Sequence, residues 1–512
     1  MHVFEAILIL LLCATMLSAV ARRIRIPYPA LLAVGGAILA FVPGAPRIDL
    51  PPELILVLFV APVLLDAAYD VSLRDLRANW VHVSSLILVA VGLTTACVAV
   101  VAHHLFPTMP WAAAIALGAI VAPPDAVAAL AVLRQVKPPH QIRIILEGES
   151  LLNDASALLI YRLAVGAAMA GHFTLSDALP AFAGVVFGSV IAGWVLAWPI
   201  GHIAARIDNA PESVVFQFVM TFASWLLAER LGLSGVVTVV VLGVTLARKP
   251  AAVLSARIRL SSFAIWETMT MVLNVLAFVL IGLALGPLLR RVDAAERLDM
   301  LLGGLAVLVT VIVVRLVWVF IYDAALRSLA PRVVSDAMRP NAKGGLIVGW
   351  SGMRGIVTLA TALALPAAFP FRDFIQVSAF IVVFGTLLLQ GLTLRPLISL
   401  LRLPEENVVD AEIGAARQVA LKAGLTEING DSSAAARRLR EEYDEALSCA
   451  EGEGDPSERS DNVLRMRMVG AARHAIEALR RSGSIGDDAY RHVEEELDRR
   501  ELTALPTEEK PS

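Results

Sequence analysis

The sequence predicts an all-α polytopic membrane protein with about thirteen transmembrane helices, followed by a polar helical tail. Of its 512 residues, 57% are hydrophobic and only 17% are charged, proportions that exclude an ordinary soluble domain. Apolar runs of about 20 residues, the length at which a helix crosses a bilayer, recur from the N-terminus to about Leu403. The chain then turns charged, so we expect a transmembrane domain at 1–403 and a cytoplasmic helical tail at 404–512.

Prolines, glycines and charged residues separate the predicted transmembrane helices. The first apolar run has no basic segment before it, and three arginines follow it at 22–25, which favours a retained helix over a cleaved signal peptide. The run at 233–247 is short, so twelve spans are an alternative to thirteen. The predicted ranges are 3–20, 28–43, 53–69, 82–105, 111–133, 143–170, 180–203, 213–229, 233–247, 263–287, 300–325, 344–368 and 375–400.

Arginine and lysine gather in alternate loops between these ranges, which sets the expected orientation. With the N-terminus outside, the predicted cytoplasmic loops hold the basic clusters at 22–25, 134–143 and 248–259. One basic cluster, at 290–297, falls in an external loop and goes against this bias. We therefore expect a multi-pass protein of the cell membrane, surrounded by lipid, with an external N-terminus and a cytoplasmic tail.

The stretch QIRIILEGESLLNDASALLIYR, at 141–162, is apolar enough to cross a bilayer and still carries several carboxylates. A charged group at the centre of a membrane helix costs about 2.5–3.5 kcal/mol on insertion scales, so it requires a partner, an ion or a proton. On a helix, Ser150 lies one turn from Asp154, and Glu149 lies one turn from Asn153. This spacing indicates an ion site at membrane depth.

A second apolar run, VAPPDAVAAL at 121–130, places Asp125 directly after two prolines. Because proline has no N–H and restricts the residue before it, we expect the helix to be interrupted just before Asp125. Unwound backbone at this depth is tolerated only where it is buried or lines a cavity. Its carbonyls, with Asp125, Ser150, Asn153 and Asp154, would form an oxygen-rich site for a small hard cation. The alternative is a buried polar network that holds two helices together.

The run GWSGMRGIVTLATALALP, at 349–366, places Arg354 among three glycines. An arginine at membrane depth requires a carboxylate partner, for which Glu149 is the first candidate. Arg315, in the earlier apolar run VIVVRLVWVF, is a second cation that requires a partner. The glycines indicate either an interrupted helix that matches the one before Asp125 or close helix packing, and the sequence leaves both open.

Asp66 is a weaker candidate. It lies deep enough in the third predicted span to reach the ion site, although it could instead be a carboxylate near the cytoplasmic end of its helix. The three cysteines are far apart and have no metal-binding spacing, so no cofactor is expected beyond the transported ions.

Four segments together resemble the sodium/proton exchangers of the monovalent cation/proton antiporter superfamily. They are GESLLNDASAL, PPDAVAAL, WETMTMVLNVLAFVLIGL and SGMRGIVTLATALALP, and the resemblance covers about residues 5–400. It implies a homodimer with two inverted repeats, broken helices that cross beside the ion site, and a mobile six-helix core that moves like an elevator. It also implies a secondary antiporter that exchanges Na⁺, Li⁺ or K⁺ for H⁺ in pH homeostasis.

Carried over to this sequence, the resemblance implies that Asp154 is the carboxylate shared by Na⁺ and H⁺, assisted by Asp125 and Ser150. Asn153 fills the first place of the family's Asn-Asp pair, which goes with electroneutral exchange. Glu149 would form a structural ion pair with Arg354 and also Arg315, and Asp66 matches an acidic position that some members use. One departure is Pro124, which replaces the threonine of many relatives and leaves only its carbonyl to bind an ion.

Two other classes of function compete with the antiporter. A cation channel would use the same acidic site, but the sequence contains no filter-like repeat. An intramembrane aspartyl protease is a remote alternative, because Tyr69 and Asp70 resemble half of such a site and no matching second half follows. We therefore expect a transporter that is not an enzyme and has no nucleic-acid partner.

Overall fold

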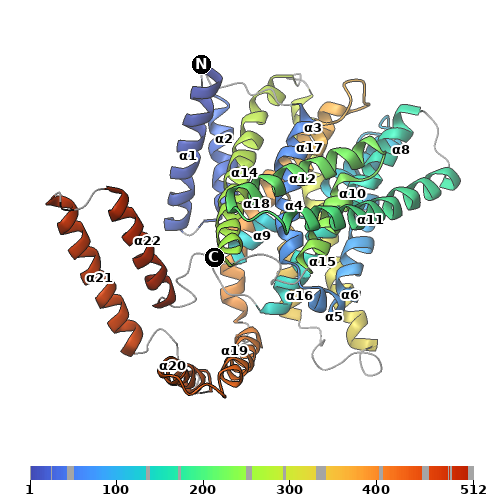
Figure 1. Ribbon diagram of the computed structural model, residues 1–512. Coiled ribbons are helices and arrows are strands. Elements are labelled where there is room, and N and C mark those ends of the chain that lie inside the picture. Colours follow the sequence, from blue (N-terminus) through green and yellow to red (C-terminus); the bar gives the residue numbers. More distant parts are fainter. Residues whose placement is uncertain are drawn as a thin grey trace. The chain divides into compact units, whose positions relative to one another are not determined.

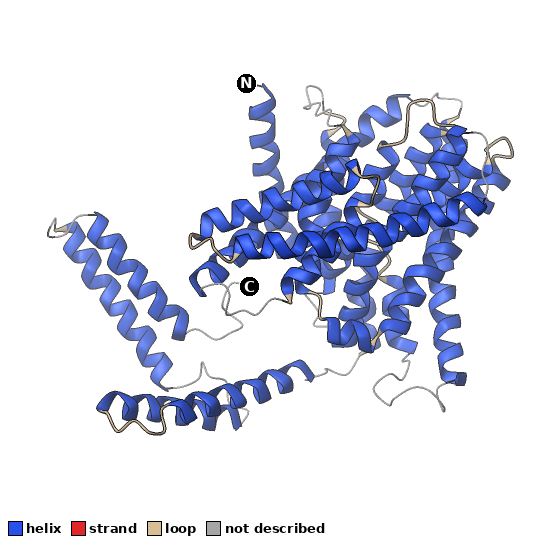
Figure 2. Cartoon of the chain, turned by 45° about the vertical axis from the view of Figure 1, so that its right-hand side comes forward, coloured by secondary structure: helices blue, strands red, loops and turns tan. Residues whose placement is uncertain are grey.

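The computed structural model describes residues 2–24, 26–42, 51–133, 139–170, 175–248, 256–291, 296–329, 342–402, 408–451, 460–482, 484 and 487–504. Across this part of the chain every regular element is a helix, and no strand occurs (Figure 2). The predicted all-α class is therefore confirmed. The chain divides into two compact units, Met1–Glu405 and Glu406–Ser512.

Every predicted span overlaps one helix or a set of consecutive helices of the first unit. Within the residues that the structure describes, six helical stretches are long and apolar enough to cross a membrane, so the total of thirteen spans and the inverted repeats stay predictions. The helices are α1 (His2–Ile24), α2 (Tyr28–Leu39), α3 (Pro52–Ile55), η1 (Leu56–Val60), α4 (Ala61–Asp70), α5 (Leu73–Ala78), α6 (Trp80–Ser84), η2 (Ser85–Ala90), α7 (Val91–Leu105), α8 (Trp111–Val121), α9 (Ala126–Leu133), α10 (His140–Ala170), α11 (Leu175–Ala204), α12 (Ala210–Arg230), α13 (Gly235–Ala247), α14 (Ala256–Arg291), α15 (Arg297–Leu329), α16 (Ala342–Trp350), α17 (Ile356–Leu363) and α18 (Arg372–Leu401).

The third predicted span is not a uniform α-helix. Its middle, η1, is π-helical, and the α-helical pattern resumes in α4 with Pro62 near its start. Because Pro62 has no N–H, it cannot donate to a carbonyl one turn earlier, and the backbone hydrogen bonds widen there. Asp66 follows one turn later and is half-buried.

Helices α2 and α14 pack backbone to backbone at glycines. A Cβ atom on Gly36 of α2 would lie 2.3 Å from the Val279 carbonyl oxygen, and one on Gly282 of α14 would lie 2.3 Å from the Ala33 carbonyl oxygen. Only residues without a side chain allow this approach, which is a common way to join membrane helices. Figure 1 shows α1, α2 and α14 side by side, and α1 contacts both of the others.

The second unit consists of two pairs of helices. In the first pair α19 (Val408–Glu427) packs against α20 (Ala434–Glu451), and in the second α21 (Ser460–Arg481) packs against α22 (Asp487–Ala504). Arg473 of α21 forms ion pairs with three carboxylates of α22, those of Glu494, Asp498 and Glu501. Because these groups are solvent-accessible, each ion pair contributes little to the stability of the unit. The shared arginine mainly fixes the alignment of α21 with α22.

Candidate ion-binding site

The predicted interruption before Asp125 is present in the structure. Helix α8 ends at Val121, residues 122–125 are not helical, and α9 begins at Ala126. Pro123 and Pro124 are both buried, as unwound backbone at membrane depth must be. The chain therefore turns out of its helix inside the protein, next to a carboxylate.

A second interruption lies opposite the first. Helix α16 ends at Trp350, residues 351–355 are not helical, and α17 begins at Ile356. The N–H of Asp125 donates to the carbonyl oxygen of Met353 at 2.6 Å, so the two unwound segments are joined directly. Both expected roles of the glycines occur, because Gly349 also lets α16 approach Leu316 closely, with 3.0 Å from an added Cβ to a methyl carbon.

Arg354 binds the end of α8. Its side chain is 1% exposed, its Nε donates to the Val121 carbonyl at 2.8 Å, and its Nη2 donates to the Ala122 carbonyl at 2.9 Å. Its Nη1 donates to the carbonyl of Gly352. The last carbonyls of a helix have no partner within the helix and carry partial negative charge, which a guanidinium matches. Arg354 therefore serves as a C-terminal cap for α8.

Glu149 pairs with Arg315. Arg315 donates from Nη2 to Glu149 Oε2 at 2.8 Å and from Nη1 to Glu149 Oε1, so the contact is bidentate. Arg315 also donates to the Val348 carbonyl at 3.0 Å, and Asn153 donates to Glu149 Oε1 at 3.1 Å. Glu149 is fully buried and Arg315 is 3% exposed, so neither charge has water as a partner.

Of the two expected partners of Glu149, Arg315 pairs with it directly, whereas Arg354, the first candidate, does not. The physical reason is geometric, because the donors of Arg354 are already directed at the carbonyls of Val121, Ala122 and Gly352. Arg354 still lies close enough to Glu149 for an electrostatic interaction. The three charged residues thus form one buried group with a single direct ion pair.

Asp154 lies on α10 and is 7% exposed, next to the fully buried Asn153. Its carboxylate is close enough to Asp125 for the two to interact electrostatically. Ser150 lies one turn earlier on the same helix and is half-buried. Four oxygen-bearing side chains expected at the site therefore come from α10 and from the interruption between α8 and α9. The part played by Asp66 stays a prediction.

A transmembrane sodium/hydrogen exchanger family model matches residues 7–400 of the chain. The chain belongs to this family. Members of the family are transporters and not enzymes, so this exchanger is a membrane-spanning transporter. The resemblance found in the four sequence segments is confirmed.

Relatives of this exchanger include antiporters from several bacteria. It is 31% identical to the sodium, potassium, lithium and rubidium/H⁺ antiporter of Bacillus pumilus, over 78% of this chain and 62% of the relative's length. It is 31% identical to the low-affinity Na⁺/H⁺ antiporter NhaS1 of Synechocystis, over 81% of this chain and 77% of that one. A solved structure, the sodium proton antiporter MjNhaP1 from Methanocaldococcus jannaschii, is similar in fold, with a TM-score of 0.60, 19% identity and coverage of 79% and 100%.

The sequence did not single out two groups that hold the site of the exchanger together. The hydroxyl of Thr386 on α18 accepts from the N–H of Arg354 at 3.0 Å, and the carbonyl of Met353 accepts from Asp125. A threonine inside an apolar helix usually bonds to its own backbone, and Thr386 also does so, to Val382 at 2.7 Å. Nothing in the sequence distinguishes Thr386 from other threonines in apolar helices. Its second partner, the N–H of Arg354, is 32 residues away in sequence and becomes a neighbour only in the folded chain.

Proposed function

We propose that this exchanger is a secondary active antiporter that moves Na⁺ one way and H⁺ the other, with Li⁺ and K⁺ as alternative cations. Asp154 is the carboxylate that carries either ion. The observation that supports this role is its burial beside two interrupted helices, within electrostatic reach of a second carboxylate, Asp125. A buried carboxylate without a basic partner is stable only with a proton or a cation bound.

The ligands of the cation would be the oxygens of Asp154, Asp125 and Ser150, with backbone carbonyls of the unwound segments. Asn153 contributes its amide oxygen, which is buried and has no hydrogen-bond partner among the described residues. Its amide nitrogen is already engaged by Glu149, so the amide oxygen keeps one orientation. A buried oxygen without a hydrogen-bond partner is unfavourable unless a ligand binds to it. A bound cation, or the proton of a protonated group, would satisfy this oxygen.

We propose that the exchange is electroneutral. Asn153 is uncharged, Glu149 is neutralised by Arg315, and Asp125 serves as a ligand whose charge stays the same. Asp154 alone therefore alternates between one cation and one proton. An elevator movement is supported by the way Arg354 links α8 to the segment before α17, because the two interrupted helices are then tied into one body. Both interruptions would move together with the bound ion.

The wider setting follows from the same proposal. We place the exchanger in the cell membrane as a homodimer, with its N-terminus outside and residues 404–512 in the cytoplasm as a separate domain. The division of the chain into units at Glu405 and Glu406 supports that boundary. Regulation of internal pH is the physiological role that this exchange would serve.

The test is transport by the full chain in proteoliposomes that contain a pH-sensitive dye. Na⁺, Li⁺ or K⁺ is added outside, with the membrane potential either free or clamped by an ionophore. Proton movement that requires a cation and is unaffected by the clamp supports electroneutral exchange. A cation current that flows without proton movement supports the channel, and no response to any of the three cations contradicts the antiporter.

A further inference from the structure

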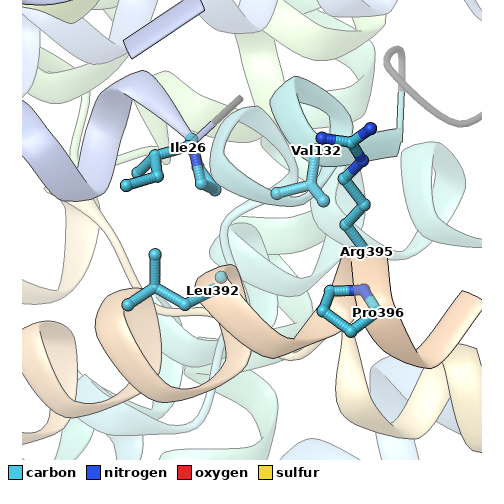
Figure 3. A pocket seen from close by; sticks show the side chains of 7 residues that line it. Ile26, Val132, Leu392, Arg395 and Pro396 are labelled. Atoms are coloured by element: carbon cyan, nitrogen blue, oxygen red, sulfur yellow. The ribbon is translucent and has the colours of Figure 1, made fainter. Parts of the chain in front are cut away.

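A small cavity opens beside the C-terminal part of α18. It has a volume of about 160 Å³, and its walls come from three separate segments of the chain. They are Ile26 and Pro27 before α2, Val132 on α9, and four residues of α18 between Gly391 and Pro396. Figure 3 shows these side chains around the opening, with α18 along one side.

The cavity has an apolar floor and one open side. Val132 is 2% exposed and Pro27 is buried, whereas Leu392 is 43% exposed on the outer face of α18. Helix α18 is one of the six that are long and apolar enough to cross a membrane. Lipid can reach an opening on the exposed face of such a helix.

Arg395 is the charged member of this wall. It is half-buried, and among the described residues no carboxylate or carbonyl accepts a hydrogen bond from it. In Figure 3 its side chain extends from α18 towards the helix that carries Val132. Arginines near the ends of membrane helices place the guanidinium at the interface, where water or an anionic headgroup binds it.

We propose that this cavity binds one anionic phospholipid, with its phosphate on Arg395 and the first part of an acyl chain against Leu392 and Val132. The planar fork of arginine matches the oxygens of a phosphate, and basic pockets between membrane helices are a recognised place for anionic headgroups. Apolar cavities of about 150 Å³ hold a molecule the size of benzene, so the cavity takes the upper methylenes of a chain and not its whole length.

One residue of the cavity wall, Gly391, lies next to the second interruption. A Cβ atom on Gly391 would lie 3.6 Å from Pro27 and 3.4 Å from the sulfur of Met353. The carbonyl of Met353 accepts the hydrogen bond from Asp125. The lipid would therefore contact Gly391 on α18 and Pro27 before α2. Gly391 in turn neighbours Met353, the residue that joins the two interrupted helices.

The experiment measures lipid binding by native mass spectrometry on the full chain purified in detergent, and it does not depend on transport. Phosphatidylglycerol and phosphatidylcholine with identical acyl chains are titrated separately. Both lipids carry a phosphate, but the choline cation offsets its charge in phosphatidylcholine, whereas phosphatidylglycerol keeps a net negative charge for Arg395. This difference is expected to give a preference of about tenfold for phosphatidylglycerol, the equivalent of one charge-assisted contact. Arg395→Gln is expected to remove this preference. The matched control, Arg206→Gln, changes an exposed arginine just after α11 and is expected to leave the preference unchanged.

A second variant tests the apolar half of the site. Leu392→Trp keeps Arg395 and fills the opening with a larger ring, so it is expected to weaken binding of phosphatidylglycerol several-fold. The proposal is overturned if Arg395→Gln keeps the wild-type preference, or if Arg206→Gln loses it to the same extent. Full affinity for phosphatidylglycerol in Leu392→Trp would also overturn it, because the chain would then bind elsewhere.

Discussion

Gly355 lies so close to Asp125 that a Cβ atom on residue 355 would be 1.5 Å from a carboxylate oxygen of that aspartate. A side chain fits in this space only if the Asp125 carboxylate moves away. The absence of a side chain at 355 therefore sets where the Asp125 carboxylate lies, at the point where the two interrupted helices meet. The glycines of the SGMRG segment have a function beyond helix packing.

We predict that Gly355→Ala slows exchange by about 100-fold, because the methyl group displaces the Asp125 carboxylate by an amount of the order of 1 Å. The measurement is the initial rate of cation-dependent proton movement in proteoliposomes. Gly166→Ala is the matched control, since residue 166 lies on α10 and a Cβ atom there meets nothing within 4 Å. A Gly355→Ala variant that transports at the wild-type rate would show that Asp125 need not occupy this position.

The cap that Arg354 provides leads to a prediction about stability. Arg354→Met removes three hydrogen bonds to the carbonyls of Val121, Ala122 and Gly352 and leaves those groups buried. Each unsatisfied buried acceptor costs about 1–3 kcal/mol, so the variant is expected to unfold at a clearly lower temperature. Thermal unfolding followed by size-exclusion chromatography measures the shift.

Lysine at residue 354 provides the control for that prediction. Arg354→Lys keeps the positive charge but presents a single nitrogen, which cannot reach three carbonyls in the fixed geometry of a guanidinium. We expect its unfolding temperature to lie between those of the wild type and Arg354→Met. If the lysine and methionine variants are both as stable as the wild type, the cap is not what holds α8 to the second interruption.

Much of this site could be predicted from the sequence. The features that could not be predicted all depend on how distant helices pack together. The double proline predicts the interruption before Asp125, and the spacing on α10 brings Ser150 beside Asp154, because local chemistry fixes both. The partner of Glu149 depends instead on how α15 and the segment before α17 pack around α10. Two arginines compete for one carboxylate, and only the tertiary arrangement shows that the carbonyls at the end of α8 bind Arg354 and leave Glu149 to Arg315.

The reassigned ion pair can be tested by a double-mutant cycle. Glu149→Gln and Arg315→Gln are each expected to lower the free energy of unfolding by about 3–5 kcal/mol, because each leaves an uncompensated buried charge. The double variant should lose much less than the sum of the two. The control cycle pairs Glu149→Gln with Arg354→Gln, and its coupling should be the smaller one. Equal coupling in the two cycles would contradict a single direct ion pair.

The two carboxylates of the ion site should respond differently to neutralisation. Asp154→Asn is expected to abolish exchange while leaving the unfolding temperature close to that of the wild type, because the buried amide carries neither a proton nor a cation. Asp125→Asn removes one of two charged ligands and keeps the shared carboxylate. It should raise the Na⁺ concentration for half-maximal exchange by about tenfold or more, the equivalent of one charge-assisted contact.

Titration of external Na⁺ in proteoliposomes measures both effects, with Ser156→Ala as the control. The hydroxyl of Ser156 bonds to the Asn153 carbonyl of its own helix at 3.0 Å and has no part in the proposed ligand set. Its removal should leave the half-maximal concentration unchanged, whereas Ser150→Ala should raise it. Exchange that persists in Asp154→Asn would transfer the central role to Asp125, since that is the neighbouring carboxylate with which Asp154 interacts.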